Sequence, residues 1–253
     1  MKANLFGFGK RGKIWAKHLI ELGFDLKIYD PAYPMFSELP NMSYVDLNII
    51  ASSSDKHILN IKDVVKKTDS TIIVEKPLVT TLEDLEWLIT NNVSTYTAFS
   101  ERFKHVVQFV KQLHLYPVKI QCVMGSEVHS NFFTDKLIHH LDLLEYLWGI
   151  REKPKYTSSF SLSNYFPTDD VTYVRSFDHP LISMIIFSTI NDYYIMDLKN
   201  NKLRMNNSDE IDFGNQDTIP QMIDDVIKLR HLPVRDYFIN SPTQRAIEMM
   251  YEN

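Results

Sequence analysis

The stretch Gly7-Phe8-Gly9-Lys10-Arg11-Gly12 decides the fold of this chain. Residues 3–8 form an apolar run typical of a buried strand, and residues 11–22 place apolar side chains at helical spacing. The glycines therefore lie at a strand–turn–helix junction. There, the first permits a tight turn, the second lets a phosphate approach the backbone, and the third allows close packing of helix on strand. The pattern predicts a dinucleotide-binding turn with the phosphates at the helix N-terminus.

An acidic residue follows the next strand. Residues 25–29 are predicted to form this strand, and Asp30 ends it. A carboxylate at this point accepts hydrogen bonds from the adenosine ribose and repels the 2′-phosphate of NADP, so NAD is the predicted cofactor. Lys10 and Arg11 leave NADP open, because a basic side chain in the turn can reach a phosphate. The competing interpretation is an ordinary glycine turn with Asp30 as a capping acid.

The chain changes its pattern near residue 100. Before residue 100, strands and helices alternate, which predicts an α/β Rossmann domain at 1–99 with a parallel sheet covered on both faces. The further strands of this domain are predicted at 45–51, 71–74 and 95–99, and its further helices at 56–67 and 82–91. After residue 100, strand follows strand at 118–128, 156–163, 171–177, 182–190, 193–198 and 202–206. Helices are predicted at 104–113, 134–148, 217–230 and 242–251. This predicts an α+β domain at 100–253 with a largely antiparallel sheet, whose C-terminal helix can pack back on the first domain.

Charge and cysteine content exclude several classes of protein. The net charge is -5, without the Lys/Arg clustering of a nucleic-acid-binding surface, so no nucleic-acid partner is expected. Cys122 is the single cysteine, which excludes an intrachain disulfide and a cysteine-based zinc cluster. The apolar run after Met1 ends at the glycine turn and is too short for a signal peptide or a membrane span. We expect a cytoplasmic protein with no membrane partner.

A second group of residues carries acid–base chemistry. Lys76 follows the strand at 71–74, at the sheet edge where open α/β folds bind ligands. Asp135 and His139 are four residues apart in the helix 134–148 and so share a face, and a carboxylate beside an imidazole suits general acid–base catalysis. Taken singly, each also fits an ordinary role: an ion-paired lysine, an acid favoured by the helix dipole, a packed histidine.

A metal site at this helix is not expected. His139, His140 and Asp142 are potential ligands, but adjacent histidines point to different helix faces.

Several motifs, in order along nearly the whole chain, resemble the Gfo/Idh/MocA family, the glucose-fructose oxidoreductase and inositol dehydrogenase group. They are the glycine turn, the stretch Ala51-Ser52-Ser53-Ser54-Asp55-Lys56-His57, the triplet Glu75-Lys76-Pro77, and Asp135-Lys136-Leu137-Ile138-His139-His140-Leu141-Asp142, which is similar to the family's D-x-G-x-H-x-x-D. Phe99-Ser100-Glu101-Arg102-Phe103 is similar to the family's entry into its second domain, and 245–248 to its closing helix. The chain is a short member, with Leu137 in place of the family's glycine and Ser53 and Ser54 near its missing proline.

The resemblance implies an NAD(P)-dependent oxidoreductase that transfers hydride between nicotinamide and a hydroxyl or carbonyl of a sugar, nucleotide sugar or related polyol. It implies Lys76, Asp135 and His139 as catalytic residues, which bind the substrate together with Arg102. The implied cofactor-binding residues are Gly7, Gly9, Lys10, Arg11, Gly12, Asp30, Ser52, His57, Glu75 and Lys76.

Two alternatives remain open: a cofactor-binding sensor without turnover, and a lyase or hydrolase that recycles NAD. A homo-oligomer, dimer or tetramer, is expected because the aromatic, β-rich second half suggests a sheet face that packs against another subunit, as in the family.

Overall fold

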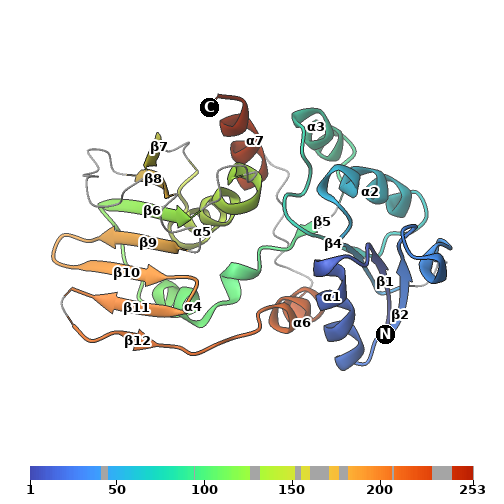
Figure 1. The fold of residues 1–253 in the computed structure, drawn as a ribbon, viewed down its shortest axis with the longest axis horizontal. Coiled ribbons are helices and arrows are strands. Elements are labelled where there is room, and N and C mark those ends of the chain that lie inside the picture. The colour runs from blue at the N-terminus through green and yellow to red at the C-terminus, as the bar shows by residue number, and fades with distance from the viewer. Residues whose placement is uncertain are drawn as a thin grey trace. The chain divides into compact units, whose positions relative to one another are not determined.

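The computed structural model of the protein describes residues 1–40, 45–93, 95–125, 132–151, 155–159, 171–176, 182–206, 208–229 and 241–252. The chain divides into two compact units (Figure 1). One comprises Met1–Phe99 and Ile219–Ile247, and the other Ser100–Thr218 and Glu248–Asn253. The ends of four predicted elements, at 126–128, 160–163, 177 and 230, lie outside the described residues.

The first unit contains a parallel five-stranded sheet in the order β2-β1-β3-β4-β5. Its strands are β1 (Lys2–Phe6), β2 (Asp25–Tyr29), β3 (Leu47–Ile50), β4 (Thr71–Val74) and β5 (Thr95–Thr97). Every residue of β3 is buried, as is usual for a central strand of a parallel sheet covered on both faces. The predicted Rossmann sheet is confirmed.

The strand order reverses direction between β1 and β3. Helix α1 (Lys10–Glu21) leads from β1 to β2 on one side, whereas α2 (His57–Val65) and α3 (Leu82–Thr90) connect the strands on the other side. Because such crossovers are right-handed, α1 covers one face of the sheet, and α2 and α3 cover the opposite face. Ligands of open α/β sheets bind at the carboxyl ends of the strands that flank such a reversal. Here those ends are Gly7, after β1, and Ala51, after β3.

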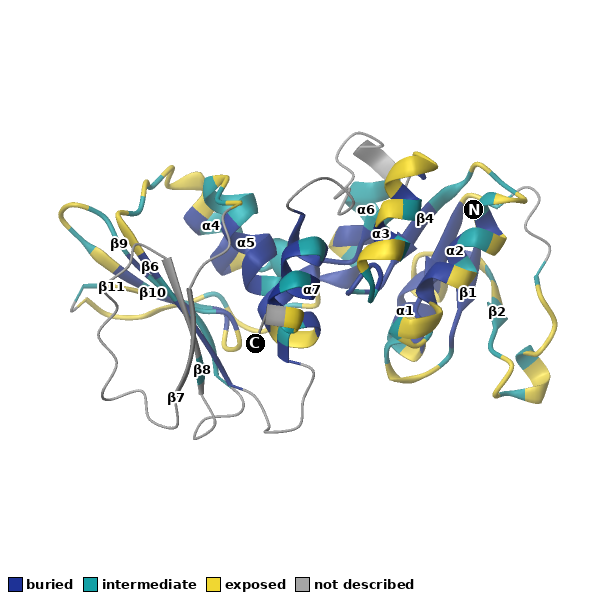
Figure 2. Ribbon diagram, turned by 90° about the horizontal axis from the view of Figure 1, so that it is seen from above, coloured by how far each residue is buried: buried dark blue, intermediate teal, exposed yellow. Residues whose placement is uncertain are grey.

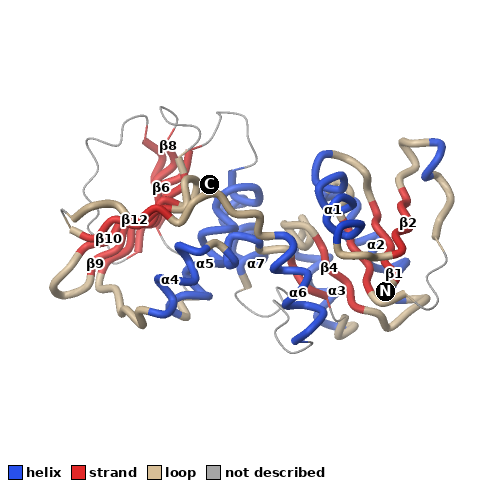
Figure 3. The backbone as a smooth tube through the Cα atoms, turned by 90° about the horizontal axis from the view of Figure 1, so that it is seen from below, coloured by secondary structure: helices blue, strands red, loops and turns tan. Residues whose placement is uncertain are grey.

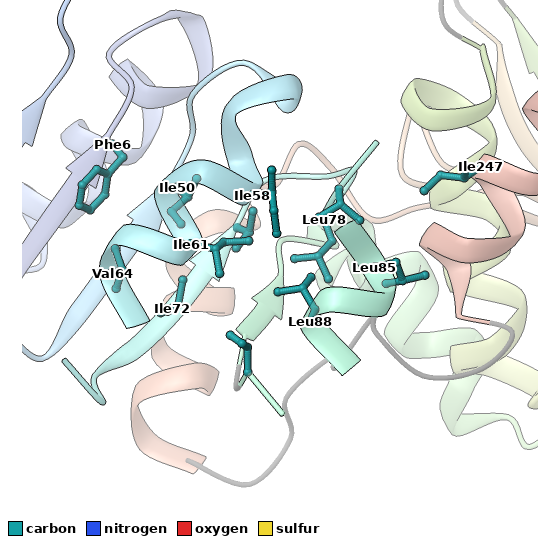
Figure 4. Close-up of a cluster of buried hydrophobic side chains, with 13 residues drawn as sticks. Phe6, Ile50, Ile58, Ile61, Val64, Ile72, Leu78, Leu85, Leu88 and Ile247 are labelled. Carbon is teal, nitrogen blue, oxygen red and sulfur yellow. The ribbon is translucent and has the colours of Figure 1, made fainter. Parts of the chain in front are cut away.

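A hydrophobic core holds the α2–α3 face on the sheet (Figure 4). It joins strand residues to Ile58 and Ile61 of α2, to Leu85 and Leu88 of α3, and to Ile247 of α7 (Pro242–Glu252). The opposite face buries Trp15 of α1, and α6 (Ile219–Leu229) packs against α1. Short 3-10 helices, η1 (Pro34–Phe36) and η2 (Ser54–Lys56), complete the unit.

The second unit contains a seven-stranded sheet in the order β12-β11-β10-β9-β6-β8-β7. The strands are β6 (Lys119–Gly125), β7 (Lys155–Ser159), β8 (Val171–Ser176), β9 (Ser183–Ser188), β10 (Tyr193–Asp197), β11 (Lys202–Met205) and β12 (Ile211–Asp212). Pairs involving β8 are parallel and the other pairs are antiparallel. The predicted, largely antiparallel sheet is confirmed.

Helices α4 (His105–Gln112) and α5 (Ile138–Trp148) lie on the same side of this sheet (Figures 2 and 3). The ring of Trp148 packs at 5.0 Å from that of Phe187 in β9, and Phe187 stacks on Tyr194 in β10. A 3-10 helix, η3 (Ser100–Phe103), precedes α4, and a π-helix, η4 (Phe133–Leu137), precedes α5. The helix predicted at 134–148 therefore exists, but its first turn is wound as a π-helix, a form that is rare and frequent at functional sites.

Candidate functional site

The glycine turn packs against the segment that follows β3. Gly7 has a φ of +97°, and a Cβ added there would lie 2.5 Å from the Ser52 nitrogen and 2.6 Å from the Ala51 oxygen. A Cβ on Gly12 would lie 2.0 Å from the Gly7 oxygen. Only glycine fits at both positions, because the backbone conformation in one and the close approach of backbone in both exclude a side chain.

Gly9 differs from the other two glycines because a Cβ added there would meet nothing within 4 Å. It is the N-cap of α1, where no side chain caps the helix. An open position at the start of a helix of this length fits the pyrophosphate of a dinucleotide, which the first backbone N–H groups and the helix dipole stabilise. Lys10 and Arg11 form the first turn of this helix.

The carboxylate of Asp30 is held by backbone groups on both sides. One oxygen accepts a hydrogen bond from the Phe8 N–H at 2.6 Å, and the other accepts one from the Ala32 N–H at 2.9 Å. Asp30 is therefore tied to the glycine turn before any ligand binds. The ring of Phe8 also packs edge-on against Tyr33 and Phe36, which follow Asp30 in the chain. These contacts fix the end of β2 next to the turn.

Glu75, directly after β4, is buried and joins the sheet edge to α1. Its Oε1 accepts hydrogen bonds from Trp15 Nε1 at 2.7 Å and from Arg11 Nε at 3.1 Å. Lys76 comes next and is partly exposed, while Pro77 is buried and follows a cis peptide bond. Glu75 thus places the start of the Lys76 turn beside the helix that follows the glycine turn.

His57 is buried and bridges two loops. Its Nδ1 lies 2.8 Å from the carbonyl oxygen of Pro77, and its Nε2 lies 3.1 Å from the carbonyl oxygen of Ser52. The Ser52 hydroxyl in turn accepts a hydrogen bond from Asn60. Burial lowers the pKa of His57 below its ordinary value of 6.5, although the two carbonyls and Glu75 oppose this shift. The neutral imidazole is therefore the favoured form at neutral pH.

In the second unit, the predicted acid–base residues lie at the junction of η4 and α5. Asp135 lies in the π-helical turn and is exposed, and His139 is the second residue of α5 and is partly exposed. His140 is buried, with its Nε2 at 3.1 Å from the Ser183 hydroxyl. The two adjacent histidines thus point to different environments, as helix geometry requires.

Arg102, predicted to bind substrate, forms an ion pair with Asp142. The guanidinium donates through Nε to both carboxylate oxygens, at 2.9 and 2.8 Å, and through Nη2 to one of them. Asp142 is fully buried, and Arg102 stacks over the ring of Tyr146 at 4.8 Å. This geometry ties η3 to α5, one turn beyond His139.

The structure brings the sequence-predicted cofactor residues together at one edge of the first sheet. Gly7, Ser52 and His57 form one series of contacts there, and Arg11 and Glu75 form another. The partners Trp15 and Asn60 were not predicted, because nothing in the sequence links them to residues in other elements. Within the described parts of the chain, no cluster of three or more potential metal ligands occurs, and no helix is long and apolar enough to cross a membrane.

Comparisons with known proteins agree with this geometry. Residues 17–107 match the model of the GFO_IDH_MocA family, described as an oxidoreductase family with an NAD-binding Rossmann fold. The matched range includes Asp30, the Ser52 segment, the Lys76 turn and Arg102. No protein of curated function matches the chain by sequence.

Solved structures share the fold over the whole chain. UDP-N-acetylglucosamine 3-dehydrogenase GnnA from Acidithiobacillus ferrooxidans aligns with a TM-score of 0.77 and 15% identity, covering 100% of this chain and 96% of that one. A Gfo/Idh/MocA family oxidoreductase from Vibrio cholerae aligns with a TM-score of 0.72 and 15% identity, covering 100% and 97%. The WlbA dehydrogenase from Bordetella pertussis, in complex with NADH and UDP-GlcNAcA, aligns with a TM-score of 0.69 and 16% identity, covering 99% and 94%.

Proposed function

We propose that the chain is an oxidoreductase of the Gfo/Idh/MocA family, whose model matches residues 17–107, and that it transfers hydride between NAD and a CH–OH group of a nucleotide sugar or related sugar. The observation that carries the proposal is the edge of the first sheet. There the open glycine turn, the held Asp30 carboxylate and the Glu75-supported Lys76 turn lie at the strand ends that flank the reversal of strand order.

In the proposed reaction, His139 accepts the proton of the substrate hydroxyl, and Asp135 orients substrate or imidazole. The Lys76 ammonium stabilises the negative charge that develops on that oxygen as it becomes a carbonyl. NAD, when bound, supplies the acceptor for the hydride that leaves the same carbon. The reverse direction uses the same groups, with His139 as the acid. Lys76 belongs to the first unit and the other two residues to the second, so their joint action is part of the proposal.

The proposed substrate class follows from the names of the structural neighbours. One neighbour is a UDP-N-acetylglucosamine dehydrogenase, and another was solved with a UDP-sugar acid. We propose that Arg102 supports the substrate site through its ion pair with Asp142, because Nε and Nη2 of its guanidinium both donate to that carboxylate.

A panel of UDP-sugars, free sugars and polyols, screened for NADH formation at 340 nm, tests this function. We expect turnover with at least one UDP-sugar, and turnover slower by roughly 10²- to 10⁴-fold in a Lys76→Ala variant that still binds NAD. NADP should bind more weakly than NAD. Asp30→Ala should reduce this difference in affinity, because it removes the carboxylate that repels the 2′-phosphate of NADP. Tighter binding of NADP than of NAD would contradict the role given to Asp30.

A homo-oligomer is also proposed. On the sheet face opposite α4 and α5, Met184, Ile186 and Ile195 alternate with the buried side chains and are only partly buried, which suits contact with a second copy. Sedimentation equilibrium would show this as a mass at least twice 29.7 kDa.

A further inference from the structure

A closed series of contacts surrounds the base of Lys76. It starts at Gly7, which lies so close to the backbone of Ser52 that a side chain at position 7 would clash with it. His57 Nε2 then meets the Ser52 carbonyl, and His57 Nδ1 meets the Pro77 carbonyl. Pro77 is the residue directly after Lys76. One arm of the series therefore runs from the phosphate turn through an imidazole to the backbone on the C-terminal side of Lys76.

The other arm reaches Lys76 from its N-terminal side. Glu75 accepts hydrogen bonds from Trp15 and Arg11, both on the helix that the glycine turn begins. Trp15 is fully buried, so this arm rests on the packed face of α1. The residues on both sides of Lys76 are thus anchored to the two ends of the glycine turn. Lys76 itself is partly exposed.

His57 cannot act by touching cofactor or substrate directly. Its side chain is 1% exposed, and both ring nitrogens face backbone carbonyls of the protein. The family resemblance implied a cofactor contact at this position, but the geometry points to an indirect effect. A neutral imidazole has one N–H, which we place on Nδ1, because the Pro77 carbonyl is the nearer of the two acceptors at 2.8 Å.

We propose that His57 is a positioning residue, which donates from Nδ1 to the Pro77 carbonyl and so holds the Lys76 ammonium in register with the dinucleotide turn. The inference rests on the proposed function, in which Lys76 acts on the substrate oxygen. It adds a residue to that reaction which lies in the first unit and never meets the reacting atoms. A displacement of roughly 1 Å at a catalytic group costs on the order of 100-fold in rate, so a small shift of the turn has a large effect.

Two amide variants separate the ring nitrogens. In His57→Asn the side-chain amide reaches about as far as Nδ1 and can donate to Pro77, whereas in His57→Gln it reaches about as far as Nε2 and can meet Ser52 instead. Both are polar, and Asn leaves the larger cavity, so a loss of packing alone would make His57→Asn the more damaging variant. His114→Asn, at an exposed histidine in the second unit, is the matched control.

The test measures kcat, KM, NAD affinity and thermal unfolding for these variants. We expect His57→Gln to lower kcat by about 10- to 100-fold with little change in NAD affinity, and His57→Asn to recover most of that loss. Equal loss in both amide variants, in proportion to their loss of thermal stability, would overturn the proposal. So would a His57→Gln variant with wild-type kcat while Lys76→Ala is strongly impaired.

A readout without turnover keeps this inference separate from the proposed function. Reductive methylation with ¹³C-formaldehyde gives an NMR signal for Lys76, which a Lys76→Arg variant assigns. We expect the NAD-induced shift of that signal to be preserved in His57→Asn and lost in His57→Gln. If the shift behaves in this way but Lys76→Ala keeps full turnover, the proposed function fails and the positioning role stands. If the shift is the same in all variants, the positioning role fails.

Discussion

Each unit of the molecule supports a candidate catalytic residue with an arginine–carboxylate pair, and the two pairs differ in design. In the first unit Arg11 meets Glu75 through one nitrogen, its side chain is 42% exposed, and Trp15 shares the same carboxylate oxygen. In the second unit Arg102 donates hydrogen bonds to both carboxylate oxygens of Asp142. The side chain of Arg102 is 16% exposed and that of Asp142 is 0% exposed. The first pair is one of several contacts around Lys76, whereas the second is a buried pair on which the helix of His139 depends.

The difference indicates where the two halves of the proposed site gain their order. The cofactor edge is held by several separate contacts, so that the loss of one leaves the others to maintain the fold of this edge. The acid–base helix begins with a π-helical turn and is fixed from behind by one strong pair. Loss of a partner should therefore matter more in the second unit than in the first.

The largest effect is expected from breaking the Arg102–Asp142 pair. Arg102→Met leaves a fully buried carboxylate without its cation, which should lower the free energy of unfolding by about 3–5 kcal/mol in urea titrations. Asp142→Leu should cost a similar amount. The double variant should recover much of the lost stability, because it leaves no buried charge without its counter-charge. A double variant whose cost equals the sum of the single costs would show that the two residues do not act as a pair.

A smaller effect is expected from His140, which is buried and lies two residues before Asp142 in α5. Burial, with a contribution from Lys104, lowers the pKa of His140 from 6.5 to about 3. Between these values the unfolded chain binds more protons than the folded one, so stability is complete above about pH 6.5 and falls as the pH falls. His140 alone should account for about 1.4 kcal/mol between about pH 7.5 and pH 5.5.

Urea titrations at the two pH values measure this contribution. His140→Gln should remove that part of the pH dependence, while His114→Gln, at an exposed position, should not. His57, whose pKa is also lowered, adds to the wild-type slope in the same direction and stays in both variants. An unchanged slope in His140→Gln would contradict the burial of a neutral imidazole.

The effects at the first pair are expected to be smaller than those at the second. Trp15→Phe removes the 2.7 Å hydrogen bond to a buried carboxylate and should cost about 1.5–3 kcal/mol. Arg11→Met should cost less than about 1 kcal/mol, because the guanidinium is close to half exposed and Trp15 remains. If Arg11→Met lowers the thermal unfolding temperature more than Trp15→Phe does, the cofactor edge depends mainly on the ion pair between Arg11 and Glu75.

Sequence patterns predict most of the fold because its elements have clear periodicity. The strands β2 and β4 have the predicted bounds, and the alternation of strands and helices predicts the parallel sheet that the structure contains. Strand β12 was not predicted, because two exposed residues carry no periodic signal and their pairing is set by β11. The π-helical turn at 133–137 likewise leaves no mark on the apolar spacing.

The candidate site is predictable in its residue types and less so in their partners. Glycine spacing identifies the turn, since only glycine tolerates the contacts that Gly7 and Gly12 make. His57 is buried between two carbonyls because loops twenty residues apart in the sequence meet around it. The ion pair between Arg102 and Asp142 joins two elements that are forty residues apart. Such pairings arise from tertiary packing, which no local pattern encodes.

The most direct test of the account is a double-mutant cycle on Lys76 and His139, followed by single-turnover formation of NADH from the best UDP-sugar of the panel. His139→Ala should slow the chemical step by roughly 10²- to 10⁴-fold with NAD affinity unchanged, and Lys76→Ala should be comparably slow. The double variant should lose far less than the product of the two single losses, because both act on the same oxygen. A folded, NAD-binding His139→Ala protein with near wild-type turnover, or strictly multiplicative losses, would contradict a single site formed by Lys76 and His139.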